Sequence, residues 1–167
     1  MKGKNTLNVE KPTCYVASPY GFAESTKGFY YNEFLPVIEQ HAEIIDPWAG
    51  PVDYILEAPA DVQPELWTRV GLQHLETISS KTDLVVAGLD QEPPDVGTVT
   101  EMAWAAAHHI PIIGYRNDLR TSGEEGLPYN LMLPAVIRAS GGIAVRSLVE
   151  LDTALKHVTT RLVEKRA

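Results

Sequence analysis

The sequence predicts an α/β protein with a five-stranded parallel sheet and helices on both faces. Short apolar runs alternate along the chain with longer segments of helical periodicity. Such alternation is typical of parallel sheets whose crossover helices cover both faces. Five strand–helix units fit a chain of 167 residues as one domain. Together these observations favour a doubly wound, flavodoxin-like arrangement, in which ligands bind at the carboxyl ends of the strands.

In the first half of the chain, short β-prone runs predict strands at residues 13–18 and 43–46. Apolar side chains at helical spacing predict helices over residues 26–41 and 66–78. Between the second strand and the second helix, residues 47–64 contain four prolines and several acidic residues. We therefore expect a long loop there.

The second half contains three further apolar runs, and we expect strands at residues 84–89, 110–115 and 142–145. Helices are expected in the alanine-rich segment after Glu101, over residues 130–139, and from the capping box of Ser147 and Glu150 to residue 162. Residues 116–129 are polar and contain glycine, and are expected to form a second long loop.

Composition excludes several classes of function. The net charge of −8 argues against nucleic acid as a partner, because phosphates need basic patches. No apolar run is long enough to cross a membrane. The single cysteine, Cys14, cannot form an intramolecular disulfide and fits a reducing, cytoplasmic location. Residues 1–12 are polar and are expected to be a disordered leader, rather than a signal peptide, before a single domain over residues 13–167.

Residues 83–104 are the most informative stretch, reading as strand, acidic loop and helix. Three carboxylates, Asp83, Asp95 and Glu101, bracket the loop. A carboxylate near a helix start is held ionised by the helix dipole, which suits a group that attacks or stabilises positive charge. Purely structural roles are also open: Thr98 and Glu101 form a capping box, Asp95 suits a turn, and Asp83 stands at a strand entrance.

Other chemistries lack their usual patterns. Neither a glycine-rich phosphate loop nor a Gly-x-Ser-x-Gly nucleophile turn is present. The only adjacent histidines, His108 and His109, would point in different directions on a helix, so no metal site is expected. Cys14, within an apolar strand, is expected to be structural. We therefore expect no cofactor and no metal ion.

Three segments of the chain carry a resemblance to a known family. Asp95-Val-Gly-Thr-x-x-Glu101 follows Asp83-Leu-Val-Val-Ala and is itself followed by Gly126-Leu-Pro-Tyr-Asn130-Leu-Met-Leu133. With the first strand and loop, Tyr15-Val-Ala-Ser-Pro-Tyr20, these segments resemble the nucleoside 2-deoxyribosyltransferase family over about residues 13–145.

The resemblance implies a double displacement at C1′ of a 2′-deoxynucleoside, with a free nucleobase as acceptor and retention of configuration. By their matches, Glu101 would be the nucleophile and Asp83 the acid that protonates the leaving base. Tyr15 would orient the nucleophile, and Asp95 would bind the sugar hydroxyls. Asn130 would be supplied by the neighbouring subunit, since the resemblance implies a homodimer that is often assembled further into a hexamer.

The expected substrate-binding set also includes loop and helix-start residues, namely Ser18, Tyr20, Phe22, Gly97 and Met132. The aromatic pair Tyr20 and Phe22 would stack on the base. Structural roles remain open here too, since loop aromatics often just pack, Tyr15 suits a core position and Asn130 suits a helix N-cap. Trp48 and Trp104 are expected in the core or an interface.

Two rival functions remain open. The first is an N-glycosidase that uses water as acceptor and acts on 2′-deoxynucleosides or their 5′-monophosphates. It would need a phosphate-binding Ser or Arg where this chain has Asn130-Leu-Met132, which favours the transferase. The second is a non-catalytic nucleotide-sensing domain, against which the joint presence of Asp83, Asp95 and Glu101 speaks.

Overall fold

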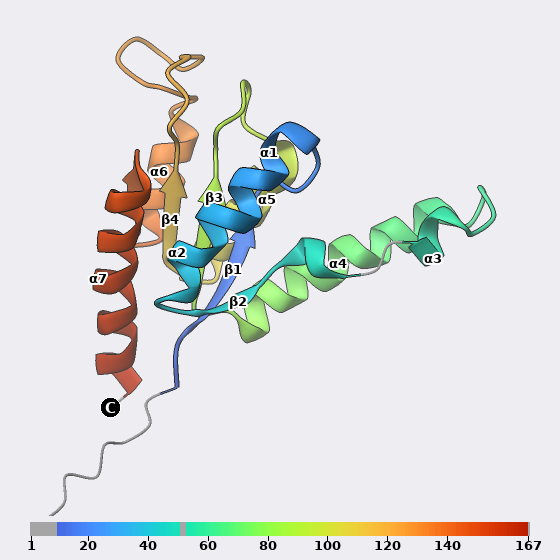
Figure 1. Ribbon diagram of the computed structural model, residues 1–167, viewed down its shortest axis with the longest axis horizontal. Helices are drawn as coiled ribbons and strands as arrows, with labels where there is room; N and C mark the ends of the chain where they lie inside the picture. Colours follow the sequence, from blue (N-terminus) through green and yellow to red (C-terminus); the bar gives the residue numbers. More distant parts are fainter. Residues whose placement is uncertain (1–9, 51–52, 167) are drawn as a thin grey trace, which may run out of the picture.

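The computed structural model describes residues 10–50 and 53–166. Its centre is a five-stranded sheet in the order β2-β1-β3-β4-β5, with every neighbouring pair parallel (Figure 1). The strands are β1 (Thr13–Ala17), β2 (Glu43–Ile45), β3 (Leu84–Gly88), β4 (Ile112–Tyr115) and β5 (Ile143–Val145). This is the strand order of flavodoxin-like doubly wound proteins, so the predicted fold class is confirmed.

Helices cover both faces of the sheet (Figure 1). One face carries α1 (Glu24–Phe29), η1 (Tyr30–Phe34), α2 (Leu35–Glu39) and α7 (Leu148–Arg166). The other carries α4 (Gln63–Lys81), α5 (Val96–Ala107) and α6 (Met132–Ala139). Two short helices, η2 (Pro47–Ala49) and α3 (Asp53–Leu56), lie between β2 and α4.

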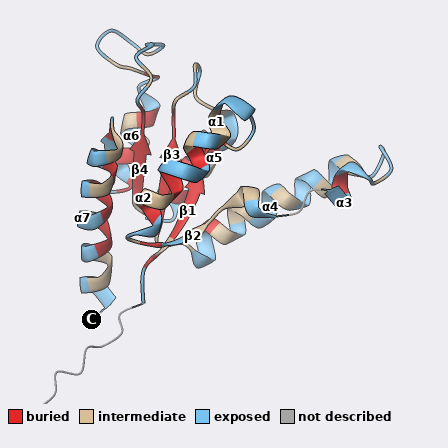
Figure 2. Ribbon diagram, viewed as in Figure 1, coloured by how far each residue is buried: buried red, intermediate tan, exposed pale blue. Residues whose placement is uncertain are grey.

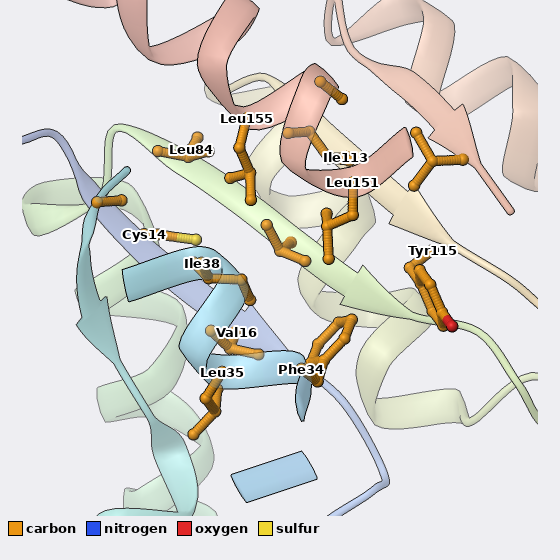
Figure 3. Close-up of a cluster of buried hydrophobic side chains, with 14 of the residues drawn as sticks. Cys14, Val16, Phe34, Leu35, Ile38, Leu84, Ile113, Tyr115, Leu151 and Leu155 are labelled. Atoms are coloured by element: carbon orange, nitrogen blue, oxygen red, sulfur yellow. The ribbon is translucent and has the colours of Figure 1, made fainter. Parts of the chain in front are cut away.

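Alternation along the strands divides the core into two clusters, one on each face. In Figure 2 the central strands are coloured as buried. In β1, Cys14 and Val16 pack with α2 and α7, as Figure 3 shows. The intervening Tyr15 and Ala17 point to the opposite face, against α4, α5 and α6. This alternation decides which side chains can reach the helix that carries Glu101.

The helix predicted over residues 26–41 is a run of three helical segments, α1, η1 and α2. The middle segment is a π-helix, and it buries Tyr30 and Phe34 in the core. Pro36, in the first turn of α2, has no N–H to donate into the preceding turn. The interruption therefore occurs where a regular helix would lack a hydrogen bond.

The prediction of a long loop over residues 47–64 is wrong in part. This segment holds η2 and α3, and α4 already begins at Gln63. Pro47 and Pro64 each stand in the first turn of a helix, where a missing N–H costs no hydrogen bond. Residues 51 and 52 lie outside the described part. In Figure 1, α3 and the adjoining part of α4 extend well away from the sheet.

The predicted loop over residues 116–129 contains no helix or strand, as expected. Of the leader predicted for residues 1–12, residues 1–9 lie outside the described part, and residues 10–12 form no helix or strand. Within the described residues, no helix combines the length and the apolar character needed to cross a membrane.

Candidate active site

A cavity of about 180 Å³ lies at the carboxyl end of β1, where the fold predicts a ligand site. The loop after β1, the short helix η2, α4 and the start of α5 all line it. The lining residues are Ser18, Phe22, Pro47, Trp48, His74, Asp95, Gly97, Thr98 and Glu101. A larger hollow of about 590 Å³ lies along β5 and α7, but none of the predicted site residues lines it.

Tyr15 of β1, buried beneath the cavity lining, reaches Glu101, which lines the cavity, although 86 residues separate the two in sequence. The Tyr15 hydroxyl donates a hydrogen bond of 2.5 Å to Oε1 of Glu101. Burial, and then the adjacent Glu101 carboxylate, raise the pKa of Tyr15 well above its usual value. The phenol therefore stays protonated at ordinary pH and remains a donor that holds the carboxylate in one orientation.

The acidic loop ends at Asp95, which is the N-cap of α5. Its Oδ2 atom accepts hydrogen bonds from the Thr98 backbone N–H at 2.8 Å and the Thr98 hydroxyl at 3.1 Å. The alternative in which Thr98 and Glu101 form the capping box is wrong, because α5 already begins at Val96. Glu101 therefore projects from the second turn into the cavity and is not used to cap its own helix.

His74 of α4 is the residue that the sequence reasoning missed. Its Nδ1 atom lies 3.6 Å from Oε1 of Glu101, and its ring packs edge-on against Tyr15 with centroids 6.2 Å apart. The indole N–H of Trp104 donates a 2.9 Å hydrogen bond to the Leu75 carbonyl, which holds α4 against α5. In the sequence, His74 stands at helical spacing from Val70 and Ile78, and this spacing alone indicates packing.

Asp83 does not belong to this cavity. It precedes β3, at the amino end of the sheet, whereas the cavity lies at the carboxyl end. Its carboxylate accepts a 2.7 Å hydrogen bond from the Thr13 backbone N–H and forms an ion pair with Arg166. The expectation that Asp83 protonates the leaving base is therefore wrong, because a strand's length lies between it and Glu101.

The loop after β1 contributes two of its three predicted residues. Ser18 is buried and lines the cavity, and Phe22 lies edge-on against Trp48 with centroids 3.9 Å apart. Tyr20 instead points into the core, where it packs against Phe29, so its predicted stacking on a base is wrong. Trp48 also lines the cavity, where its indole N–H donates a 3.0 Å hydrogen bond to the Ser18 carbonyl. The sequence had predicted a core or interface position for this tryptophan.

Asn130 and Met132 lie outside the cavity of their own chain, at the start of α6. Both are exposed. The side-chain Oδ1 of Asn130 accepts a 3.0 Å hydrogen bond from the Met132 N–H. Gly97, by contrast, lines the cavity, and a Cβ there would approach Oδ2 of Asp95 to 3.0 Å. Glycine thus keeps the cavity open beside the Asp95 carboxylate.

Comparison with known proteins relates the chain to one family. A family model described as nucleoside 2-deoxyribosyltransferase matches residues 14–132. A search of curated protein sequences found no match. Among the described residues, no three His, Cys, Asp or Glu side chains cluster so that they could hold a metal ion.

Three solved structures share the fold. A conserved protein from Enterococcus faecalis V583 is 20% identical, with a TM-score of 0.64 over 88% of this chain and 98% of that chain. A 2-deoxyribosyltransferase from Bacillus psychrosaccharolyticus is 20% identical, with a TM-score of 0.57 over 84% and 90%. A CMP N-glycosidase from Clostridium botulinum is 18% identical, with a TM-score of 0.55 over 84% and 98%.

Proposed function

Because the chain belongs to the nucleoside 2-deoxyribosyltransferase family, we propose that it transfers 2-deoxyribose from a 2′-deoxynucleoside to a second nucleobase. Membership makes the chain an enzyme of the deoxyribosyltransferase or N-glycosidase type. The single observation that carries the finer proposal is the 2.5 Å hydrogen bond from Tyr15 to Glu101. It leaves one carboxylate oriented and accessible in a cavity, as a nucleophile needs to be.

In the proposed reaction, the Glu101 carboxylate attacks C1′ and the base departs with the electron pair of the C1′–N bond. The transition state has oxocarbenium character, which an adjacent carboxylate stabilises and then captures as a glycosyl ester. A second base displaces the ester, so two inversions give net retention. This scheme requires neither a cofactor nor a metal ion.

The other cavity residues suit the two halves of the substrate. Asp95 uses Oδ2 for the helix cap, which leaves Oδ1 as an acceptor for a sugar hydroxyl. The aromatic rings of Phe22 and Trp48 form one wall of the cavity and offer apolar surface for a planar base. Ser18 and Gly97 complete the proposed binding set beside them.

We propose that the enzyme is a dimer in which Asn130 and Met132 enter the partner's cavity. Both residues are exposed and neither contacts the cavity of its own chain. The projecting arm of α3 and α4 also exposes several large apolar side chains, as expected of a surface that another subunit covers. These are Tyr54, Leu56, Trp67 and Leu72.

Incubation with 2′-deoxyinosine and adenine tests the proposal by chromatography. Formation of 2′-deoxyadenosine supports transfer. Release of free deoxyribose without a new nucleoside would identify an N-glycosidase instead, and no reaction would contradict both. A parallel incubation with 2′-deoxyinosine 5′-monophosphate tests the nucleotide substrate. We expect it to react poorly, because no lysine or arginine is among the described residues that line the cavity.

A further inference from the structure

The proposed reaction needs a proton that none of the carboxylates is placed to supply. A departing base must be protonated on nitrogen, and the incoming base must lose a proton. Glu101 is the proposed nucleophile, Asp95 is bound into the cap of α5, and Asp83 lies at the other end of the sheet. Among the described residues lining the cavity, His74 is the one remaining side chain that commonly exchanges protons near neutral pH.

We propose that His74 donates the proton to the departing base and later accepts the proton of the incoming base. This inference rests on the proposed function. The Nδ1 atom of His74 lies 3.6 Å from Oε1 of Glu101, which is too long for a hydrogen bond. Nδ1 is therefore not engaged by Glu101. A nucleophile approaches C1′ to about 3–3.5 Å before bond formation. The His74 ring is therefore about as close to Glu101 as the attacked carbon would be.

The position of His74 is set by packing on both sides. Edge-on contact with Tyr15 and the junction of α4 with α5 hold the ring, while 32% of the His74 side chain stays exposed. His74 also lines a second hollow of about 390 Å³ between α4 and α5, which opens from the same Glu101 carboxylate. His74 and Glu101 therefore both border open space large enough for a base.

The proton balance closes over the two half-reactions. In the first, Glu101 forms the C1′–O bond, the C1′–N bond breaks, and the imidazolium of His74 gives its proton to the base nitrogen. In the second, neutral His74 takes the N–H proton of the incoming base, whose nitrogen attacks C1′ as the C1′–O bond breaks. The enzyme ends with the same protons it began with, so transfer consumes no net proton.

Two carboxylates and one phenol face the His74 ring. Glu101 and Asp95 of α5 line the same cavity, and Tyr15 of β1 packs against the ring. Asp46, before η2, is close enough to Tyr15 to affect its pKa.

The experiment compares two substrates that differ in their need for a proton. The base of 2′-deoxyinosine needs protonation to leave, whereas the base of 7-methyl-2′-deoxyinosine already carries a positive charge and leaves as a neutral molecule. Rapid quenching measures the first burst of base released by wild type, His74→Asn and the matched control His157→Asn. His157 is exposed on α7, away from the cavity. Enzyme-free samples correct for spontaneous loss of the methylated base.

We expect His74→Asn to slow the burst with 2′-deoxyinosine by about 10²–10⁴-fold, and with the methylated substrate by less than about tenfold, while His157→Asn matches wild type on both. Equal slowing on both substrates would overturn proton donation and make His74 a positioning residue. Absence of base release by wild type from either substrate would overturn the proposed function itself.

Discussion

Replacing Tyr15 with phenylalanine removes one hydroxyl and leaves the ring in the core. The change deletes the 2.5 Å hydrogen bond to Glu101, in which the acceptor is a carboxylate. Hydrogen bonds to charged groups contribute about 1.5–3 kcal/mol. If this bond keeps Glu101 aligned for attack, its loss should lower kcat/KM by about 10- to 150-fold.

The assay is exchange of 2′-deoxyinosine with adenine, followed by chromatography, with thermal unfolding to confirm that the variant is folded. Tyr20→Phe is the matched control, because Tyr20 is also buried but packs in the core on the opposite face of the sheet. We expect Tyr20→Phe to keep wild-type exchange. A folded Tyr15→Phe variant with undiminished kcat/KM would refute the role given to the phenol.

Three further predictions concern assembly and stability. Glu101→Ala and Asn130→Ala homodimers should each be strongly impaired. Their refolded mixture should regain about a quarter of wild-type activity, because half the dimers are then mixed and each mixed dimer holds one intact site. No recovery, with mixed dimers confirmed by mass spectrometry, would contradict the shared site. Arg116→Met should destabilise the fold by about 3–5 kcal/mol, because its buried guanidinium pairs with an acid and bonds three carbonyls; thermal unfolding measures this, and the exposed Arg120→Met serves as a control that should change little. Burial raises the pKa of the Cys14 thiol from 9.0 to about 12, so the contribution of the buried thiol to stability is present below pH 9 and is lost as the pH rises toward 12. Urea unfolding at a series of pH values gives the free energy of unfolding, which should fall more steeply with pH for wild type than for Cys14→Ala. Equal dependence on pH in the two proteins would contradict this prediction.

The positions of the strands and of the acidic loop before Glu101 were within reach of sequence reasoning because they are local patterns. Apolar runs separated by helical periodicity predicted all five strands to within two residues at each end. The spacing from Asp95 to Glu101 placed both residues at one helix start, and both line the cavity. The segment at residues 47–64 was harder, since proline reads as a breaker although it fits the first turn of a helix.

The predictions of site residues were wrong where they depended on the end of the strand at which a residue stands or on the direction of its side chain. Asp83 adjoins the same strand as the acidic loop, but it stands at the amino end, so its carboxylate faces Thr13 and Arg166. Tyr20 stands in the correct loop, but its ring turns into the core against Phe29. A motif gives the position of a residue along the chain, and neither case could be decided without the orientation of the backbone.

The sequence by itself determined the α/β class, the order of elements and the family, because these follow from periodicity and short motifs. The family resemblance implied that Tyr15 orients Glu101, but only the tertiary structure decided that His74 joins them. They come from β1, α4 and α5, and their meeting depends on the sheet face to which Tyr15 points and on how α4 packs against α5. Such contacts arise from the packing of segments far apart in the sequence. The spacing of a histidine along its own helix does not show which residue of another helix or strand it will contact.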